Sequence, residues 1–190
     1  RRPVTFGAAR AIPEESVLTH HREDDVDLYR QALEVMTATP AVLRPLLPAI
    51  PEEVLARPPA PGAWSPLRVL GHLLYVETVI IGPRVRLMLE EDDPLFPPGP
   101  PERETRPAEA ILADLVAARE EHLALLRALG PEQRRRSGRH AEYGRVTVEE
   151  HVIEWAYHDL DHLRQVLAAL QVPLYPGIGV FQALYPPPSA

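Results

Sequence analysis

TVEEHVIEWAYHDLDHLRQVLAAL, residues 147–170, has the pattern of one long amphipathic helix. Thr147 and Glu150 stand at the spacing of a capping box, so the helix is predicted to begin there. Side chains that recur at steps of three or four, and therefore share one stripe of this helix, are His151, Trp155, His158, His162, Gln165 and Ala169. We expect this stripe to face the core.

His158 and His162 are the most informative pair on that stripe. They are four residues apart, so on a helix their imidazoles project from the same face and can both reach one metal ion. Single inward-facing histidines are usually core residues satisfied by hydrogen bonds, which is the competing interpretation. Because two histidines stand at ligand spacing and His151 precedes them on the same face, we favour a metal site.

Three further helical patterns precede this one, over residues 24–47, 66–91 and 105–130. The first is interrupted at Thr39-Pro40, which predicts one bent helix or two abutting ones, and the second is expected to kink at Gly82-Pro83. Four long helical patterns without a convincing strand period predict an all-α four-helix bundle. Metal sites in such bundles lie between facing helices.

The other segments set the expected domain organisation. The chain of 190 residues suits a single domain, with a core over about residues 24–170 and an extension over 1–23. Residues 92–104 hold five prolines, which predicts a stiff surface connection rather than a domain boundary. The proline-bearing tail, residues 171–190, is expected to pack over the bundle through Phe181, Leu184 and Tyr185.

Composition excludes several classes of function. A net charge of -7 and an isoelectric point near 5.6 argue against a general binder of nucleic acids or anionic membranes. The absence of cysteine excludes disulfides, thiolate zinc sites and a cysteine nucleophile, so thiol chemistry would need an external thiol. Since the chain has no apolar signal core and no apolar run long enough to span a bilayer, we expect a cytoplasmic protein that acts on a small molecule.

Two known patterns of metal site do not fit. The run from His158 to His162 imitates the zinc-protease helix, but residues 163–190 contain no His, Asp, Glu or Cys to serve as the downstream third ligand. A di-iron carboxylate site needs Glu-x-x-His on two helices, and no glutamate in this chain stands three residues before a histidine. A third protein ligand must therefore come from upstream.

The upstream histidines differ in their surroundings; they are His20, His21, His72, His122, His140 and His151. His72 stands out because it lies about two turns into the second helical pattern among apolar residues, and Gly71 would let a neighbouring helix approach closely. We expect the first two to be solvated. His122 is expected in an exposed or interhelical position, and His140 at the mouth of the site.

Several short motifs carry a family resemblance: Trp64-Ser65, Gly71-His72-Leu73, Glu77, Gly144-Arg145-Val146-Thr147-Val148 and His158-Asp159-x-x-His162-x-x-Gln165. In their order and spacing the chain resembles the DinB-like superfamily of DinB/YfiT-type four-helix bundles, whose helices run up-down-down-up. The family includes bacillithiol S-transferases and relatives of mycothiol-dependent enzymes. The resemblance implies that the metal ligands are His72, His158 and His162, with water in the remaining positions.

The implied ligand set allows more than one chemistry. Three neutral imidazoles suit a divalent metal, with zinc or nickel favoured and iron or cobalt as alternatives, and an open coordination position is typical of a reactive site. We favour a metal-dependent enzyme resembling the bacillithiol-type S-transferases, with a low-molecular-weight thiol as co-substrate. The alternatives are a metal-dependent hydrolase and a non-catalytic bundle with a structural or vestigial metal site.

Residues around the histidines are candidates for supporting roles. Those expected to orient ligands or move a proton are Tyr75, Glu77, His151 and Asp161, each with a solvated or interhelical ion pair as the alternative. A cluster before the last helix, either simply solvated or attracting an anionic substrate, consists of Arg134, Arg135, Arg136, Arg139 and Arg145. The resemblance also suggests a homodimer and a role in stress response.

Overall fold

The computed structural model describes residues 27–102 and 106–188, so His20, His21 and the predicted N-terminal extension lie outside the described residues. Its long helical segments are α1 (Leu28–Leu46), the continuous run of α3 (Pro66–Tyr75), η2 (Val76–Ile81) and α4 (Gly82–Glu90), then α5 (Ala108–Arg127) and α7 (Val148–Gln171). The shorter elements are η1 (Leu47–Ala49), α2 (Glu52–Leu55), α6 (Pro131–Arg135), β1 (Ser137–His140), β2 (Gly144–Thr147) and η3 (Tyr175–Leu184).

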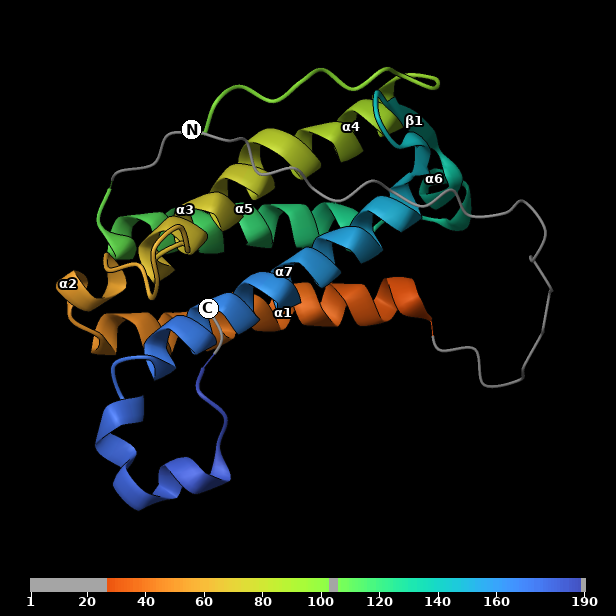
Figure 1. Cartoon of the computed structure of the whole chain (residues 1–190). Coiled ribbons are helices and arrows are strands. Elements are labelled where there is room, and N and C mark those ends of the chain that lie inside the picture. The colour runs from red at the N-terminus through yellow and green to blue at the C-terminus, as the bar shows by residue number, and fades with distance from the viewer. Residues whose placement is uncertain (1–26, 103–105, 189–190) are drawn as a thin grey trace.

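The long helices form a four-helix bundle whose directions follow the up-down-down-up order (Figure 1). Helix α1 packs against α5 and α7, and α3 packs against the same two helices. Since α3–α4 and α5 are consecutive yet parallel, the connector returns along the length of the bundle, and its described residues 91–102 lie above α4 in Figure 1. The predicted all-α bundle is confirmed.

The predicted helix starts agree with the caps in the structure. The side-chain oxygen of Thr147 accepts a hydrogen bond from the backbone N–H of Glu150 at 3.1 Å, and the Glu150 carboxylate accepts one from the backbone N–H of Thr147 at 2.8 Å. Ser65 accepts from the N–H of Arg68 at 3.2 Å, and Pro66 occupies the first helical position. These caps fix where α7 and α3 begin.

Helix α1 is one helix although it contains Pro40 and Pro45. A proline has no N–H, so Pro40 leaves the carbonyl oxygen of Met36 without its usual helical donor. The guanidinium of Arg119, on α5, donates to that oxygen at 2.8 Å. The interruption predicted at Thr39-Pro40 is therefore bridged by a side chain from a neighbouring helix.

The second long segment departs from α-helical geometry just before Gly82. Residues Val76–Ile81 form a π-helical turn, and α4 continues from it with Pro83 in its first turn. A Cβ at Gly82 would lie 2.5 Å from Nε2 of His122, so only glycine allows α5 to place its histidine there. The irregularity predicted at Gly82-Pro83 is present, as a π turn on its N-terminal side.

Buried apolar side chains form two clusters along the bundle. One contains Tyr29, Met36 and Trp155 with their neighbours, and the other is built around Leu70 and Leu115. Between these two apolar clusters lie three buried charged residues: Glu77, Arg119 and Asp159.

The β-hairpin and the tail differ from the sequence-based expectations. Strands β1 and β2 pair antiparallel, with Ser137 opposite Thr147, although the sequence has no convincing strand period. Each strand has four residues, too few to give a strand period. The expectation that the tail packs over the bundle is wrong for its described residues: Phe181 is 61% and Leu184 70% exposed.

The length and hydropathy of the helices can be compared with what is needed to span a membrane. In the described part of the chain, no single helix is long and apolar enough to cross a bilayer. Helices α7 and η3 meet that criterion only as a pair, and they are bent by 105° relative to each other.

Candidate metal centre

His72 on α3 faces His158 and His162, which lie one turn apart on α7. Nε2 of His158 is 3.2 Å from Nε2 of His72 and 3.0 Å from Nε2 of His162. Metal–nitrogen bonds of about 2.0–2.1 Å at ordinary coordination angles separate two ligand nitrogens by about 2.9–3.4 Å. The two separations about His158 are therefore those expected for ligands of a single ion, and one ligand atom of each histidine lies within 4.8 Å of the others.

The outer nitrogen atoms of two of these rings have acceptors. Nδ1 of His72 lies 2.9 Å from a carboxylate oxygen of Glu102, and Nδ1 of His162 lies 3.2 Å from Oε1 of Gln165. The Gln165 amide nitrogen donates to Asp161 at 2.9 Å, which directs the amide oxygen toward His162. An acceptor at Nδ1 requires the proton there, so both Nε2 atoms keep a lone pair for a metal.

Burial favours the neutral form of His158 and His162. Loss of solvent, together with the neighbouring His162 and His72, lowers the pKa of His158 to about 3. Burial and His72 also lower the pKa of His162. Since a metal binds only the neutral imidazole, His158 is in the ligand form at neutral pH, and the shift at His162 also favours that form.

An aromatic side chain borders the histidines. The Trp64 ring stands edge-on to His72 with centroids 4.9 Å apart, and stacks on His162 with centroids 6.0 Å apart. The guanidinium of Arg68 lies 4.2 Å from the centroid of Trp64. The His72 side chain is 18% exposed, so the centre can be reached from solvent.

A buried charge network lies beside the centre and joins all four long helices. Arg119 on α5 donates to Asp159 on α7 at 2.5 Å, to Glu77 on η2 at 2.9 Å and to the Met36 carbonyl oxygen on α1 at 2.8 Å. His122 lies 2.8 Å from the second carboxylate oxygen of Glu77. The two carboxylates outweigh the effect of burial and raise the pKa of Arg119, so it remains charged.

Residues 36–166 match the family model described as the DinB superfamily. The chain belongs to the DinB superfamily. The family resemblance inferred from the sequence motifs is thereby confirmed. No protein with a curated description matches the chain in sequence.

Solved structures show the same superfamily fold. YfiT from Bacillus subtilis, described as a probable metal-dependent hydrolase with an unusual four-helix bundle topology, is 22% identical with a TM-score of 0.70. That match covers 80% of this chain and 92% of YfiT. TT2238, described as a four-helix bundle protein, is 24% identical with a TM-score of 0.56 over 74% of this chain and 98% of its own.

Within this DinB fold, the predicted supporting residues have different positions. Asp161 contacts the centre through Gln165, as described above. Glu77 instead forms the interhelical pair that was its alternative role. Tyr75 donates its hydroxyl to the Pro100 carbonyl oxygen, and His151 stacks on Phe96 with centroids 5.9 Å apart.

The remaining predicted residues lie elsewhere in the bundle. His122 is interhelical, as expected. His140 lies in the hairpin before α7, about 15 Å or more along that helix from the metal-centre histidines, so it does not line the centre's mouth. The arginine cluster shares that distant end, where Arg136 pairs with Asp92 and Arg139 with Asp93. This placement favours a structural role over attraction of a substrate to the centre.

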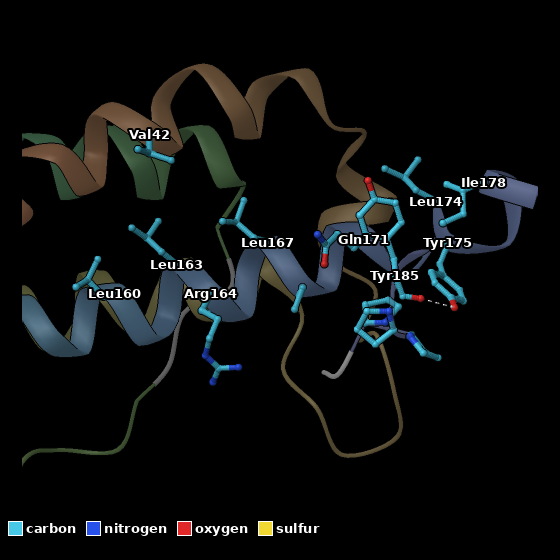
Figure 2. Close-up of a pocket in the computed structure, with 14 residues that line it drawn as sticks. Val42, Leu160, Leu163, Arg164, Leu167, Gln171, Leu174, Tyr175, Ile178 and Tyr185 are labelled. Carbon is cyan, nitrogen blue, oxygen red and sulfur yellow. Dashed lines mark hydrogen bonds between the residues drawn. The ribbon is translucent and has the colours of Figure 1, made fainter. Parts of the chain in front are cut away.

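A groove of about 920 Å³ lies between α7, α1 and the tail (Figure 2). Leu160 and Leu167 of α7, Val42 of α1 and Tyr185 of the tail are among its walls. None of the three metal-centre histidines lines it. Leu160 and Leu167 belong to a different stripe of α7, so the groove is separate from the centre.

Sequence reasoning missed residues that touch the centre from irregular or distant segments. Glu102 reaches His72 from the connector, and Arg68 reaches Trp64 from the next turn of α3. Arg119 reaches the residue beside His158 from the charge-rich α5. Because Trp64 precedes the first residue of α3, helical spacing gave no signal for its contact with Arg68.

Proposed function

We propose that this chain is a divalent-metal-dependent enzyme whose metal is held by His72, His158 and His162. The observation that carries the proposal is the convergence of three Nε2 atoms, with separations of 3.0 and 3.2 Å about His158. The same three residues form the one group in the described residues whose ligand atoms all lie within 4.8 Å of one another. Zinc and nickel are the first metals to test, followed by iron and cobalt.

The favoured reaction is transfer of the sulfur of a low-molecular-weight thiol to an electrophilic carbon. A divalent cation in this centre would lower the pKa of a bound thiol or water and so make a nucleophile available near neutral pH. The sulfur forms a bond to carbon, the leaving group departs with the electron pair of the broken bond, and the thiol proton passes to solvent. The thiol comes from outside, because the chain has no cysteine.

Arg68 and Trp64 are the side chains that we assign to substrate binding. Trp64 presents an apolar ring against two of the histidines. The guanidinium of Arg68, held over that ring, has no ion-pair partner among the described residues. A carboxylated thiol would complement that charge while its sulfur approaches the histidines.

Hydrolysis is the second candidate, favoured by the description of the structurally similar YfiT as a probable metal-dependent hydrolase. The same three histidines would serve that reaction, with water in place of the thiol. The two reactions differ in their reactants, so one preparation of the enzyme can be assayed for both.

The first experiment measures metal content in protein purified without a metal-affinity column. We expect one metal ion per chain in the wild type, loss of the metal in His158→Ala, and retention in His140→Ala, which alters a histidine in the distant hairpin. The wild type should then consume thiol with a chloro-dinitrobenzene electrophile, and His158→Ala should not. Absence of stoichiometric metal would contradict the metal site. Metal without thiol consumption would contradict the transferase reaction, and the same preparation would then be assayed for ester hydrolysis, the second candidate.

A further inference from the structure

Residues 94–102 of the connector between α4 and α5 contact the bundle at several points. We call this segment the strap. At its start the strap pairs with β1: the N–H of Phe96 donates to the Arg139 carbonyl oxygen at 2.9 Å, and the N–H of Arg139 donates to the Pro94 carbonyl oxygen at 2.7 Å. The Phe96 ring is 4% exposed. This end of the strap is therefore held by backbone pairing and by a buried aromatic ring.

The middle of the strap lies against α3 and η2. Four of its residues at positions 97–101 are prolines, which favour a stiff, extended backbone. The hydroxyl of Tyr75 donates to the Pro100 carbonyl oxygen at 2.5 Å. A Cβ at Gly99 would meet the Ile80 side chain and lie 2.6 Å from the Tyr75 hydroxyl, so a larger residue there would have to displace the ends of these two side chains.

The strap ends on the metal centre. The Glu102 carboxylate lies 2.9 Å from Nδ1 of His72, and its side chain is 26% exposed. Among the described residues, no other carboxylate is bonded to one of the three histidines. The acceptor for His162 is the neutral amide of Gln165, so Glu102 supplies the one negative charge that touches a ligand ring.

We propose that Glu102 is a positioning residue for the metal centre, and that the strap delivers it to His72. This inference rests on the proposed function, because it assumes that His72 binds the metal. The carboxylate accepts the Nδ1 proton of His72, which fixes the tautomer and the ring orientation and makes Nε2 a stronger donor. The negative charge of Glu102 would also partly offset the positive charge of the ion, because the three imidazole ligands are neutral.

The test is the affinity of the metal-free protein for Zn²⁺, measured by competition with a chelating indicator. Glu102→Gln keeps the size of the side chain and removes its charge, and we expect affinity to fall about 10- to 100-fold. Glu91→Gln is the matched control: it makes the same change at the other end of the connector, away from the histidines, and should leave the affinity unchanged. Thermal unfolding of the metal-free forms checks that both variants fold.

Gly99→Ala tests the strap without changing the carboxylate. The added methyl group would meet the ends of the Tyr75 and Ile80 side chains and should disturb the hydrogen bond of Tyr75 to the strap, so Zn²⁺ affinity should fall in the same direction as in Glu102→Gln. The visible spectrum of bound Co²⁺ should change in both variants, because it reports the geometry of the ligands. Unchanged affinity and spectrum in Gly99→Ala would overturn delivery by the strap.

The outcomes separate this inference from the proposed function. Wild-type affinity in Glu102→Gln, together with loss of binding in His158→Ala, would overturn the role of Glu102 and leave the three-histidine site in place. Failure of the wild type to bind Zn²⁺ would overturn both. Weaker binding in Glu102→Gln and in Gly99→Ala, with Glu91→Gln unaffected, is the result expected.

Discussion

His151 shares a stripe of α7 with His158 and His162, yet its surroundings differ from theirs. Its side chain is 7% exposed, its ring stacks on Phe96, and its Nε2 atom has no hydrogen-bond partner among the described residues. Burial, with Arg84 and His140 nearby, lowers its pKa to about 4. The nearest carboxylate is that of Glu154, 3.7 Å from Nδ1, and it does not offset the burial of the ring. A buried histidine of this kind makes the folded state sensitive to acid.

Acid should destabilise the protein through His151. In the unfolded chain its pKa is 6.5, and in the folded protein about 4, so between these values the unfolded state binds more protons. The free energy of unfolding therefore falls as the pH is lowered from about 7 to about 4, by roughly 3 kcal/mol for this residue. Urea unfolding of metal-free wild type and His151→Gln across that range measures the effect.

The comparison with His151→Gln isolates one histidine, because the other titrating groups are common to both proteins. The variant should show a shallower dependence of stability on pH. His140, which contributes to the lowered pKa of His151, is present in both proteins. Equal slopes for the wild type and His151→Gln would contradict the prediction.

At the residue scale, sequence could predict contacts that follow helical spacing but not those made across the fold. His158 and His162 lie on one face because the α-helical repeat requires it, and the family resemblance supplied His72 as the third candidate ligand. Glu102 could not be found in this way, because the path of a proline-rich connector depends on where β1 and Tyr75 hold it. Arg119 stood in a helix whose many charges gave no sign of which one is buried.

At the scale of the elements, Arg119 compensates for one local irregularity and pairs with two other helical segments. Pro40 removes a helical hydrogen bond from α1, and Arg119 donates to the Met36 carbonyl oxygen that is left without its helical donor. Glu77, the second of its partners, lies in the π-helical turn, and Asp159 follows a metal-centre histidine on α7. One cation thus fixes the relative positions of the helices that carry the three histidines.

Removal of that cation should strongly destabilise the bundle. Arg119→Met keeps much of the side-chain volume but leaves Glu77 and Asp159 buried without their partner, which typically costs about 3–5 kcal/mol. Urea unfolding at neutral pH measures the loss. The matched control is Arg86→Met, which removes an exposed ion pair with Glu121 and should cost about 0–1 kcal/mol. A similar loss in the two variants would show that the buried network adds little.

The helices could be predicted from the sequence where capping residues and prolines mark the ends of the hydrophobic pattern. The first residues of α3, α5 and α7 follow from Ser65, Pro107 and Thr147, which precede these helices and act locally. The hairpin before α7 was missed because its four-residue strands are stabilised by pairing with each other and with the connector, through the bridge between Leu95 and Arg139. Pairing between distant segments leaves no periodic signal in either of them.

At the scale of the whole molecule, the tail leaves a large apolar surface uncovered. Segment η3 contains no buried residue, and Val180 is 86% and Phe181 61% exposed. It flanks the groove of about 920 Å³, whose walls on α7 include the exposed Leu160 and Leu167 (Figure 2). Exposed apolar surface of this kind usually marks an interaction site, and the homodimer suggested by the family resemblance is the partner that we propose.

This proposal predicts that charge on the tail weakens self-association. A twofold dimer would place the same apolar surface of each chain against its copy, so an acidic side chain at Phe181 or Leu184 would have to be buried without a partner. We expect sedimentation velocity to show a dimer for the wild type and a shift toward monomer, by about tenfold or more in the dissociation constant, for Phe181→Glu with Leu184→Glu. Leu28→Glu, at a 56% exposed position at the start of α1, is the control and should remain dimeric. A monomeric wild type at all concentrations, or an undisturbed dimer in the double variant, would exclude the tail as the dimer contact.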